Sequence, residues 1–502
     1  KDEIHTKIMS KIMSDTPSLS LSPAYRLRCA DVVRVACGAL TLQISNEALL
    51  AMQRSHDALQ TILKRGDAVY GLTTGFGPLV RYDGTANDAQ GIGLIAHLGA
   101  GYGENVEREV VRGAMLTRLH TLAQGMSGIA PATAQFYATL LNKNIIAAVP
   151  SIGSLGASGD LIPLAHIVRA MTGEGEVLYG SETIPAQQAL HENGLQPCIL
   201  TSRDALALVN GTSFSSAYMA LAVERSRRLL ACAEDVTGWI MRVLRCRMSG
   251  LDARLHAAKG HSGQEESARN ILREASLDGY TEDPARTLQE IYSIRCAPQI
   301  LAAVRDVLYQ SQATTEQELN GVDDNPLVDA SALQALHGGN FMTQHIAFAA
   351  DSLNSALTQT GNLAERQIEM LVNPTFNGDA PLLLAARAGA TSGMAGVQIT
   401  ATALLGEMRS HRQQYASSSL PTNAGNQDIV PMGFQAAREC YHQTERLAAL
   451  LACEALCVAQ LAALKGYSGA QPAWMMSFEP LREDRAMRGE IQRLAEQILR
   501  GV

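Results

Sequence analysis

The segment at residues 153–166 brings several reactive residue types together in one short run. It reads Gly-Ser-Leu-Gly-Ala-Ser-Gly-Asp-Leu-Ile-Pro-Leu-Ala-His, so Ser158 stands in a glycine-rich turn. A serine hydrolase is one interpretation, but its nucleophile elbow needs a glycine two residues after the serine, where this chain has Asp160. A phosphate-binding loop would need a Gly-Lys-Ser/Thr sequence, which does not follow here. A plain glycine turn before a helix is the third interpretation.

The tripeptide Ala157-Ser158-Gly159 can also cyclise on itself. The amide nitrogen of Gly159 would attack the carbonyl carbon of Ala157, and loss of two waters, one carrying the Ser158 hydroxyl, would leave an exocyclic methylidene. The residue types fit, because Gly159 has no side chain to block the attack, Ala157 suits a compressed turn, and Ser158 supplies the leaving group. The product, 4-methylidene-imidazol-5-one, is an electrophile made from the chain itself.

Other short segments have residue types suited to binding an amino acid or moving a proton. They read Tyr-Gly-Leu-Thr-Thr-Gly-Phe-Gly at 70–77, Asn-Gly-Thr at 210–212, Tyr-Ser-Ile-Arg-Cys-Ala-Pro-Gln at 292–299, Asp-Asn-Pro at 324–326, Gly-Gly-Asn-Phe at 338–341 and Asn-Gln-Asp at 426–428. With the tripeptide, and in this order, they resemble the aromatic amino acid ammonia-lyase and aminomutase family. That family includes the histidine, phenylalanine and tyrosine ammonia-lyases, and the resemblance is greatest to the bacterial tyrosine-type enzymes.

The resemblance implies removal of ammonia from an aromatic L-α-amino acid to give the trans-arylacrylate. The enzyme must lower two energy barriers, because ammonia is a poor leaving group and the benzylic β-proton is barely acidic. The electrophile would lower the first barrier by bonding the substrate amine, with no metal and no external cofactor. Bonding to the ring instead is the alternative known for the family.

Two tyrosines and a carboxylate clamp follow from the resemblance. Tyr70 is the candidate base for the β-proton, and because a free tyrosine titrates near ~10, we expect helix N-termini or cations to lower its pKa. Tyr292 would relay a proton or contact the amine. Arg295 would clamp the substrate carboxylate through its planar fork of donors, and Asn325 would share that carboxylate. A turn tyrosine and a solvated loop arginine are the plain alternatives.

The other implied site residues are amides and pocket walls. Asn210 and Gln289 would hydrogen-bond the imidazolone or the substrate, because charge that develops on the imidazolone oxygen needs preorganised donors. Phe341 would form a wall of the pocket. Glu407 and Gln427 match pocket positions of the family, although Glu407 could equally be a buried structural acid.

The pair His97-Leu98 bears on which aromatic ring is bound. In the family this pair strongly influences selectivity, and His-Leu resembles the tyrosine-selective enzymes. An imidazole can hydrogen-bond a para-hydroxyl, and Leu98 supplies an apolar wall, so we expect L-tyrosine as substrate and trans-p-coumarate as product. Dihydroxyphenylalanine and phenylalanine stay open as substrates, and a satisfied core histidine is the plain alternative for His97.

The elements that hold these residues differ between two parts of the chain. The first part, with many Gly-rich turns, predicts helices at 47–64 and 106–124, a hairpin at 176–185 and a helix capped by Thr201. After residue 210, long amphipathic runs predict further helices, at 215–248, 343–372, 394–412 and 433–465. Helices this long need partners along most of their length, so we expect a bundle.

We therefore predict a mainly α protein with the ammonia-lyase (aspartase/fumarase-like) architecture. A flexible leader at 1–22, in which Lys-Ile-Met-Ser occurs twice, would precede a Gly-rich N-terminal domain at 23–214 that carries the imidazolone. A long-helix bundle and C-terminal region would occupy 215–502. The resemblance also implies a homotetramer whose active sites combine residues from three subunits, and Ala-rich helix faces suit such packing.

Composition argues against several other classes of protein. The chain has 502 residues, 46% of them hydrophobic, which excludes wholesale disorder. A net charge of -8, without long runs of like charge, disfavours a nucleic-acid or membrane-surface partner. The nine cysteines lack zinc-type spacing and are too few for a disulfide scaffold. We therefore expect the protein to lie in the reducing cytoplasm. The sequence contains no run of 18 or more apolar residues, so we expect no membrane-spanning segment.

Three other functions compete with the lyase. A tyrosine 2,3-aminomutase would use the same electrophile and base but return ammonia to the β-carbon. A hydrolase would keep Ser158 as an intact serine. A non-catalytic helical scaffold would leave Tyr70, Arg295 and the tripeptide unexplained.

Overall fold

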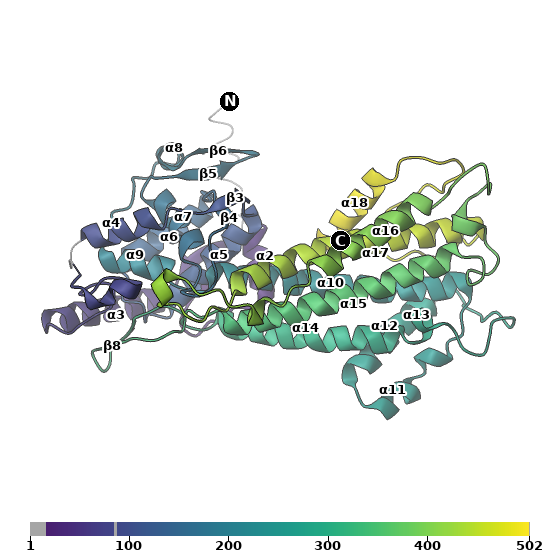
Figure 1. Ribbon diagram of the computed structural model, residues 1–502, viewed down its shortest axis with the longest axis horizontal. Coiled ribbons are helices and arrows are strands. Elements are labelled where there is room, and N and C mark those ends of the chain that lie inside the picture. Colours follow the sequence, from purple (N-terminus) through teal and green to yellow (C-terminus); the bar gives the residue numbers. More distant parts are fainter. Residues whose placement is uncertain (1–16, 85–87, 501–502) are drawn as a thin grey trace. The chain divides into compact units, whose positions relative to one another are not determined.

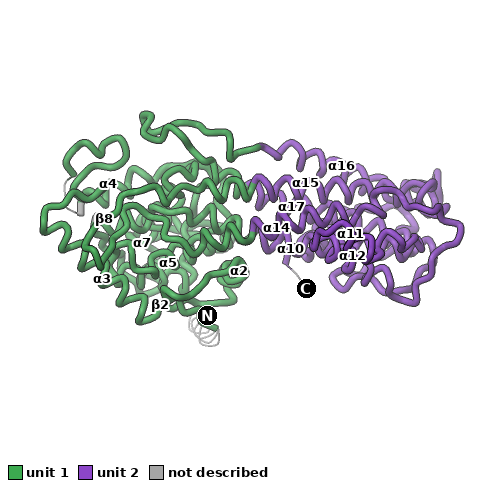
Figure 2. The backbone as a smooth tube through the Cα atoms, turned by 90° about the horizontal axis from the view of Figure 1, so that it is seen from below, with its two compact units in different colours: residues 1–221, 312–350, 414–438 green, residues 222–311, 351–413, 439–502 purple. Residues whose placement is uncertain are grey.

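The computed structural model describes residues 17–84 and 88–500 and is mostly helical, which confirms the predicted mainly α fold (Figure 1). The chain forms two compact units, coloured separately in Figure 2. Unit 1 runs to residue 221 and adds residues 312–350 and 414–438, and unit 2 contains residues 222–311, 351–413 and 439–502. Unit 1 thus includes the predicted N-terminal domain, together with two segments from later in the chain.

Unit 1 consists of short helices and two-stranded sheets. Its helices are α2 (Cys29–Ala36), α3 (Asn46–Lys64), α4 (Asp88–His97), α5 (Arg108–Ala123), α6 (Pro131–Asn142), α7 (Leu161–Met171), α8 (Ala186–Glu192) and α9 (Ser202–Val209), with short 3-10 helices η1 (Gly77–Arg81), η4 (Tyr415–Ser417) and η5 (Asn423–Gly425). Its strand pairs are β1 (Ser18–Leu21) with β2 (Thr41–Ile44), β3 (Tyr102–Asn105) with β4 (Pro150–Ile152), β5 (Glu176–Tyr179) with β6 (Glu182–Pro185), and β7 (Leu327–Asp329) with β8 (Gln334–Leu336). The first pair is parallel and the other three are antiparallel.

The predicted leader at 1–22 needs a correction at its end. Residues 1–16 lie outside the described part of the chain, but Ser18–Leu21 forms strand β1 and pairs with β2 from Ser18↔Thr41 to Leu21↔Ile44. Along β1, exposed and buried residues alternate, so that Leu19 and Leu21 enter the core. This period of two, rather than the local composition, makes the segment a strand.

Several predicted elements of unit 1 are confirmed. Helix α3 begins after Ser45, whose hydroxyl accepts the Ala48 N–H at 3.1 Å as an N-cap. The segment predicted as a hairpin forms β5 and β6. Thr201 caps α9, because its hydroxyl accepts the Asp204 N–H at 3.2 Å.

Long helices dominate the rest of the chain. Helices α10 (Ser213–Leu244), α14 (Ala297–Leu319), α15 (Gln344–Val372) and α17 (Gly433–Leu464) contribute residues to both units, and unit 2 also contains α11 (Ala253–Lys259), α12 (Ser262–Ala275), α13 (Tyr292–Arg295), α16 (Ala395–Ser410), α18 (Arg488–Arg500), η2 (Ser249–Leu251) and η3 (Leu382–Leu384). Inside unit 2, buried ion pairs join neighbouring helices: Arg305 of α14 lies 2.5 Å from Glu234 of α10. The predicted long helices are confirmed, whereas α14 was not predicted.

Two small hydrophobic clusters in unit 1 hold the loops of interest in place. One contains Val69 and Leu72, which flank Tyr70, and packs them on Leu59 and Ile62 of α3. The other packs Ala157 against Val430 and Met432, which come from a distant part of the chain. Burial of these side chains fixes the backbone on both sides of Tyr70 and at the start of the Ala-Ser-Gly tripeptide.

Two helical stretches are long and apolar enough to cross a membrane by length and composition alone. They are Arg203–Leu244 and Gly433–Leu464, with mean hydropathy 1.3 and 2.1 in their most apolar windows. These windows are 100% and 83% buried inside the fold. Such burial is typical of the core helices of a folded protein.

Candidate active site

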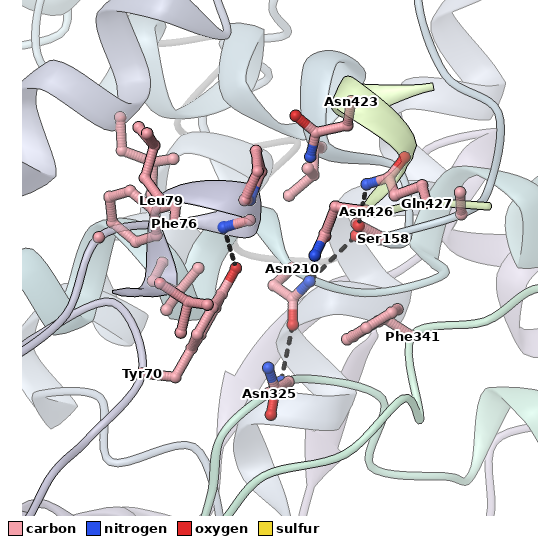
Figure 3. A pocket seen from close by; sticks show the side chains of 18 of the residues that line it. Tyr70, Phe76, Leu79, Ser158, Asn210, Asn325, Phe341, Asn423, Asn426 and Gln427 are labelled. Carbon is pink, nitrogen blue, oxygen red and sulfur yellow. Dashed lines mark hydrogen bonds between the residues drawn. The ribbon is translucent and has the colours of Figure 1, made fainter. Parts of the chain in front are cut away.

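Unit 1 contains a cavity of about 900 Å³ (Figure 3). Its walls include nine of the residues predicted from the sequence: Tyr70, His97, Leu98, Ala157, Ser158, Asn210, Asn325, Phe341 and Gln427. Gly159 is not among the lining residues, although it follows Ser158 in the same turn. The fold therefore collects segments separated by up to several hundred residues into one cavity.

Four predicted site residues belong to unit 2 and are not among those that line this cavity. Tyr292, at the start of α13, is 70% exposed, and the guanidinium carbon of Arg295 lies 4.6 Å from the centre of its ring. Gln289 is exposed in the preceding loop. Glu407 is also exposed, so the alternative of a buried structural acid is wrong for this residue.

The Ala-Ser-Gly tripeptide turns against a second glycine. Gly159 has φ +67°, in the left-handed region that favours glycine, and a Cβ there would overlap the backbone of Gly211. The next residue, Asp160, donates its N–H to the Gly211 carbonyl at 2.7 Å. The two glycine backbones therefore lie directly against each other, with no space for a side chain at residue 159.

Amide side chains surround Ser158. The Asn210 Nδ2 donates to the Ser158 carbonyl at 3.0 Å, and the Gln427 Nε2 donates to the Ser158 hydroxyl at 2.6 Å. The other end of the Asn210 amide, Oδ1, accepts the Asn325 N–H at 2.7 Å. These residues fit the predicted imidazolone, because its formation needs a glycine without steric hindrance and its oxygen needs donors of this kind.

Asp160 is a buried acid directly after the tripeptide. Its carboxylate accepts hydrogen bonds from the Ser154 hydroxyl at 2.8 Å and from the Ser215 hydroxyl and N–H at 3.0 and 2.8 Å. Burial raises the pKa of Asp160 to about 6, although these hydrogen bonds oppose the rise. The carboxylate thereby fastens the tripeptide to the first residues of α10.

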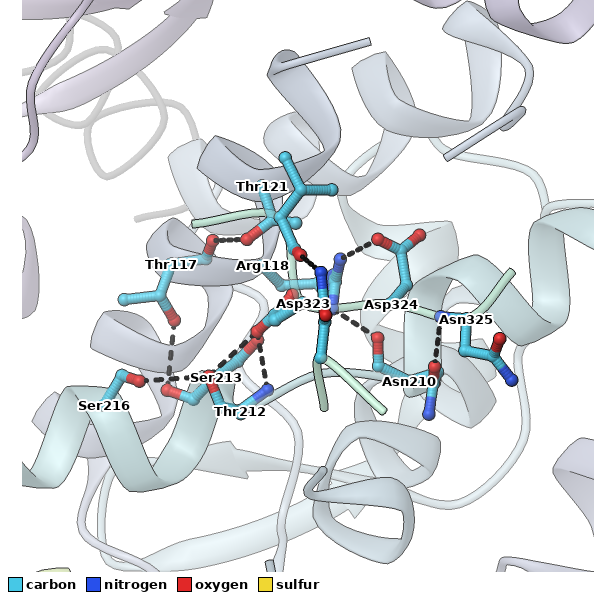
Figure 4. Close-up of polar contacts among 12 residues, drawn as sticks. Thr117, Arg118, Thr121, Asn210, Thr212, Ser213, Ser216, Asp323, Asp324 and Asn325 are labelled. Carbon is cyan, nitrogen blue, oxygen red and sulfur yellow. Dashed lines mark hydrogen bonds and ion pairs between the residues drawn. The ribbon is translucent and has the colours of Figure 1, made fainter. Parts of the chain in front are cut away.

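A buried ionic cluster supports the segment that carries Asn210 (Figure 4). Arg118 donates to the Asn210 carbonyl at 2.6 Å and to Asp323 at 3.1 Å, and Asp323 in turn accepts the Thr212 N–H at 2.6 Å. A Cβ on Gly211, between Asn210 and Thr212, would collide with the Arg118 guanidinium. The peptide groups on both sides of Gly211 are therefore each hydrogen-bonded to a charged side chain, Arg118 on one side and Asp323 on the other.

Asp324 completes this ionic cluster. Its carboxylate lies 3.7 Å from Arg118 and 3.1 Å from Arg203, and the Asp324 side chain is fully buried. Burial raises the pKa of Asp324, while the two guanidinium groups act against that rise. Because Asn325 follows directly, the ion pairs also fix the residue whose N–H binds Asn210.

Tyr70 is held by its own loop. Its hydroxyl oxygen accepts the Gly77 N–H at 2.7 Å, and its ring meets Phe76 edge to face with centroids 6.2 Å apart. Burial raises the pKa of Tyr70, and the Gly77 hydrogen bond opposes the rise only in part. The expected lowering of this pKa is therefore wrong for the single chain, whose described residues place no cation strong enough to outweigh desolvation.

His97 ends helix α4 at the cavity wall. It is exposed rather than buried, so the plain alternative of a core histidine is wrong. Its Nδ1 lies 3.1 Å from the Gly93 carbonyl oxygen, which assigns the proton of a neutral ring to Nδ1. The Nε2 atom is then a hydrogen-bond acceptor, which suits a hydroxyl donor on a ligand.

The cavity also contains residues that sequence reasoning missed. They include Leu79, Gln90, Asn423 and Asn426. Gln90 could have been found from the predicted role of His97, because it precedes His97 by seven residues and so lies on the same face of a helix. Among the described residues, no cluster of three or more His, Cys, Asp or Glu side chains could hold a metal ion.

Comparison with known proteins places this geometry in a family. Residues 27–482 match the family model described as aromatic amino acid lyase. The chain is 38% identical to a tyrosine ammonia-lyase of Cereibacter sphaeroides over 93% of this chain and 94% of that protein. It is 37% identical to a histidine ammonia-lyase of Gloeobacter violaceus over 87% of this chain and 86% of that protein.

Solved structures agree with the sequence comparison. A tyrosine aminomutase from Streptomyces globisporus superposes with a TM-score of 0.90 at 33% identity, over 96% of this chain and 97% of that one. The chain belongs to the aromatic amino acid lyase family. It is therefore an enzyme of the ammonia-lyase and aminomutase group, and the predicted ammonia-lyase architecture is confirmed.

The ionic cluster predicts a large stability cost for Asp324→Asn. This change leaves Arg118 and Arg203 buried with less opposing charge, and breaking a buried ion pair costs about 3–5 kcal/mol. We expect the unfolding free energy, measured by denaturant titration, to fall by roughly this amount. The control Asp67→Asn breaks an exposed ion pair with Arg65 and should change it by about 1 kcal/mol or less. Equal effects of the two changes would contradict a supporting role for the cluster.

Proposed function

We propose that the protein catalyses non-oxidative elimination of ammonia from L-tyrosine to give trans-p-coumarate. The observation that carries this proposal is the 3.1 Å contact of His97 Nδ1 with the Gly93 carbonyl oxygen, which in a neutral ring leaves Nε2 as an acceptor at the cavity wall. A para-hydroxyl is a donor that fits this acceptor, whereas the ring of phenylalanine would leave it unpaired. The tyrosine ammonia-lyase relative at 38% identity supports the same substrate.

The modified tripeptide is part of the proposal. The residues that would hold a 4-methylidene-imidazol-5-one made from Ala157, Ser158 and Gly159 are Asn210 and Gln427, whose amides donate to Ser158. When formed, this group supplies an electrophilic carbon, which makes ammonia a better leaving group. Its ring oxygen would be the present Ser158 carbonyl oxygen, so Asn210 would keep its acceptor, whereas the Ser158 hydroxyl that Gln427 now binds would leave as water.

The chain's own residues carry the remaining steps. Tyr70 would remove the β-proton, and the Gly77 N–H holds its oxygen in place and stabilises the deprotonated form. Asn325 would donate its Nδ2 to the substrate carboxylate, because its Oδ1 already accepts the Gly338 N–H at 2.9 Å. Phe341 and Leu98 exclude water from the ring.

We further propose that the four predicted residues of unit 2 act in the cavities of neighbouring copies. Tyr292 and Gln289 are exposed, and Arg295 and Glu407 carry charges that a substrate amino acid can pair with. A homotetramer with sites shared by three subunits would bring these groups to Tyr70, Ser158 and Asn210. Added positive charge from Arg295 would also oppose the rise that burial causes in the pKa of Tyr70.

Product analysis tests the proposal against its nearest rival. The tyrosine aminomutase structure from Streptomyces globisporus favours a second candidate, conversion of L-tyrosine to β-tyrosine. Purified protein incubated with L-tyrosine should release p-coumarate and ammonia in equal amounts, measured by liquid chromatography. Predominant β-tyrosine would reject the lyase in favour of the mutase, and no product from tyrosine would reject both.

Tyr70 predicts the pH dependence of turnover. The base is the deprotonated phenolate, and because burial raises the pKa of Tyr70, the active fraction increases with pH below that pKa by about tenfold per unit. We expect kcat/KM to rise through the alkaline range. Tyr70→Phe should lower kcat by about 10²–10⁴-fold with the tripeptide still modified. Full activity in this variant would remove Tyr70 as the base.

His97 predicts substrate preference. In His97→Phe the acceptor for the para-hydroxyl is lost, and a hydrogen bond of about 1–3 kcal/mol corresponds to a fall of about 5–150-fold in the tyrosine to phenylalanine ratio of kcat/KM. The control His191→Phe changes an exposed histidine of α8 and should leave the ratio unchanged. An unchanged ratio in the His97 variant would show that His97 does not bind the hydroxyl.

A further inference from the structure

The loop that carries Tyr70 is closed by backbone hydrogen bonds. The Gly84 N–H donates to the Thr73 carbonyl at 2.9 Å, and the Gly75 N–H donates to the Tyr82 carbonyl at 3.0 Å. These two bonds close residues 73–84, and we call residues 70–84, which also include Tyr70 just before the closure, the base loop. It also contains Gly77, whose N–H binds the Tyr70 hydroxyl. A displacement of the base loop would move the proton acceptor and its hydrogen-bond donor together.

Gln90 ties the base loop to helix α4, in addition to the packing of Leu72 on α3 and the hydrogen bond from the Tyr70 N–H to His337. The Gln90 Nε2 donates to the Thr74 carbonyl at 2.8 Å and to the Gly71 carbonyl at 3.4 Å. Two carbonyl oxygens converge on this amide nitrogen, so the orientation of the amide is fixed by chemistry, since only NH₂ can serve both. The Gly71 and Thr74 carbonyls, on the two sides of the first turn of the base loop, are thus held by the same side chain.

The junction between Gln90 and the base loop is tightly packed. A Cβ on Gly84 would lie 2.7 Å from the Thr74 carbonyl oxygen and 2.9 Å from the Gln90 Oε1. Contacts that short force a shift, so residue 84 must be glycine for the amide to reach the loop. Gln90 of α4 therefore contacts both ends of the base loop: the first turn at Gly71 and Thr74, and the closing end at Gly84.

The same face of α4 carries the residue that recognises the ring. Gln90, Leu94 and His97 follow one another at spacings of four and three residues, which places them on one side of a helix, and all three line the cavity. Gln90 and His97 are the polar members of this set. Helix α4 thus holds the base loop at one point and the acceptor for a ring hydroxyl two turns away.

We propose that Gln90 is a positioning residue that fixes the separation between the Tyr70 hydroxyl and His97. This inference rests on the proposed function, in which Tyr70 removes the β-proton and His97 receives the para-hydroxyl. For tyrosine, both ends of the substrate side chain are then constrained, and the β-proton meets the base only if α4 and the base loop keep their separation. Phenylalanine has no hydroxyl to anchor, so its ring can shift to follow a displaced base.

Gln90→Met tests this coupling, because methionine has a similar length and no hydrogen-bond donor. A misplacement of about 1 Å costs about 10²-fold in rate, so kcat for tyrosine should fall by about 10–100-fold. The kcat for phenylalanine should fall by less than about threefold, and KM for both should stay within about threefold. The pH at which kcat/KM rises should stay the same, because Tyr70 and the Gly77 N–H that binds its hydroxyl belong to one loop and move together.

Two further variants make the test independent of one substitution. Gly84→Ala presses on the same junction from the loop side and should reproduce the tyrosine-selective loss of kcat. Gln53→Met is the matched control, since this helical glutamine of α3 is exposed, bonds Asp57 at 2.8 Å and is not among the cavity-lining residues. It should leave both substrates unaffected. Intact-protein mass of every variant establishes that the tripeptide is modified to the same extent as in the wild type.

The outcomes separate this inference from the proposed function. An equal loss of kcat on both substrates in Gln90→Met and Gly84→Ala, or no loss on either, would overturn the coupling and leave Gln90 as an ordinary structural residue. If Gln90→Met does not mature, Gly84→Ala carries the test, because it disturbs the same junction from the loop side. Failure of the proposed function appears in the wild type itself, as absence of turnover on tyrosine.

Discussion

The contact between the backbones of Gly159 and Gly211 is the constraint on which the rest of the site depends. Neither glycine can carry a side chain, because a Cβ on one would meet the other's backbone and a Cβ on the second would meet Arg118. Asn210 and Thr212, on either side of Gly211, are held by Arg118 and Asp323. A buried ionic cluster thus determines how the tripeptide turns and which amide faces Ser158, although none of its charged groups lines the cavity.

Burial favours the function of the Ala-Ser-Gly tripeptide and opposes that of Tyr70, the two functional parts of unit 1. It strengthens the hydrogen bonds that fix the tripeptide, since each bond in a low-dielectric interior is harder to replace with water. It also raises the pKa of Tyr70 and so disfavours the form needed for proton removal. A single chain therefore builds a well-ordered turn but leaves a smaller fraction of its base deprotonated at a given pH. A cation beside Tyr70 would oppose this rise, and the proposed entry of Arg295 from a neighbouring copy would supply one.

The sequence indicated much of this arrangement and missed parts of it for identifiable reasons. Amphipathic periodicity predicted α15 and α17, whereas α14 has a polar C-terminal half, residues 310–318, without an apolar stripe, and was not predicted. Glycines, amides and tyrosines in recurring motifs pointed to the cavity residues. Gln90 escaped notice because its partners are the carbonyls of Gly71 and Thr74, and backbone acceptors leave no trace in residue types. The pKa of Tyr70 was misjudged because desolvation depends on packing that only the fold defines.

The central claim is that three residues of the chain become the electrophile, and the mass of the purified wild-type protein tests it most directly. Cyclisation of Ala157-Ser158-Gly159 removes two water molecules and changes nothing else in the covalent structure. The account predicts an intact mass lower than that of the printed sequence by two waters per chain, with the deficit in the peptide that contains residues 157–159. A mass equal to that of the unmodified sequence, with Ser158 recovered as serine, would contradict it.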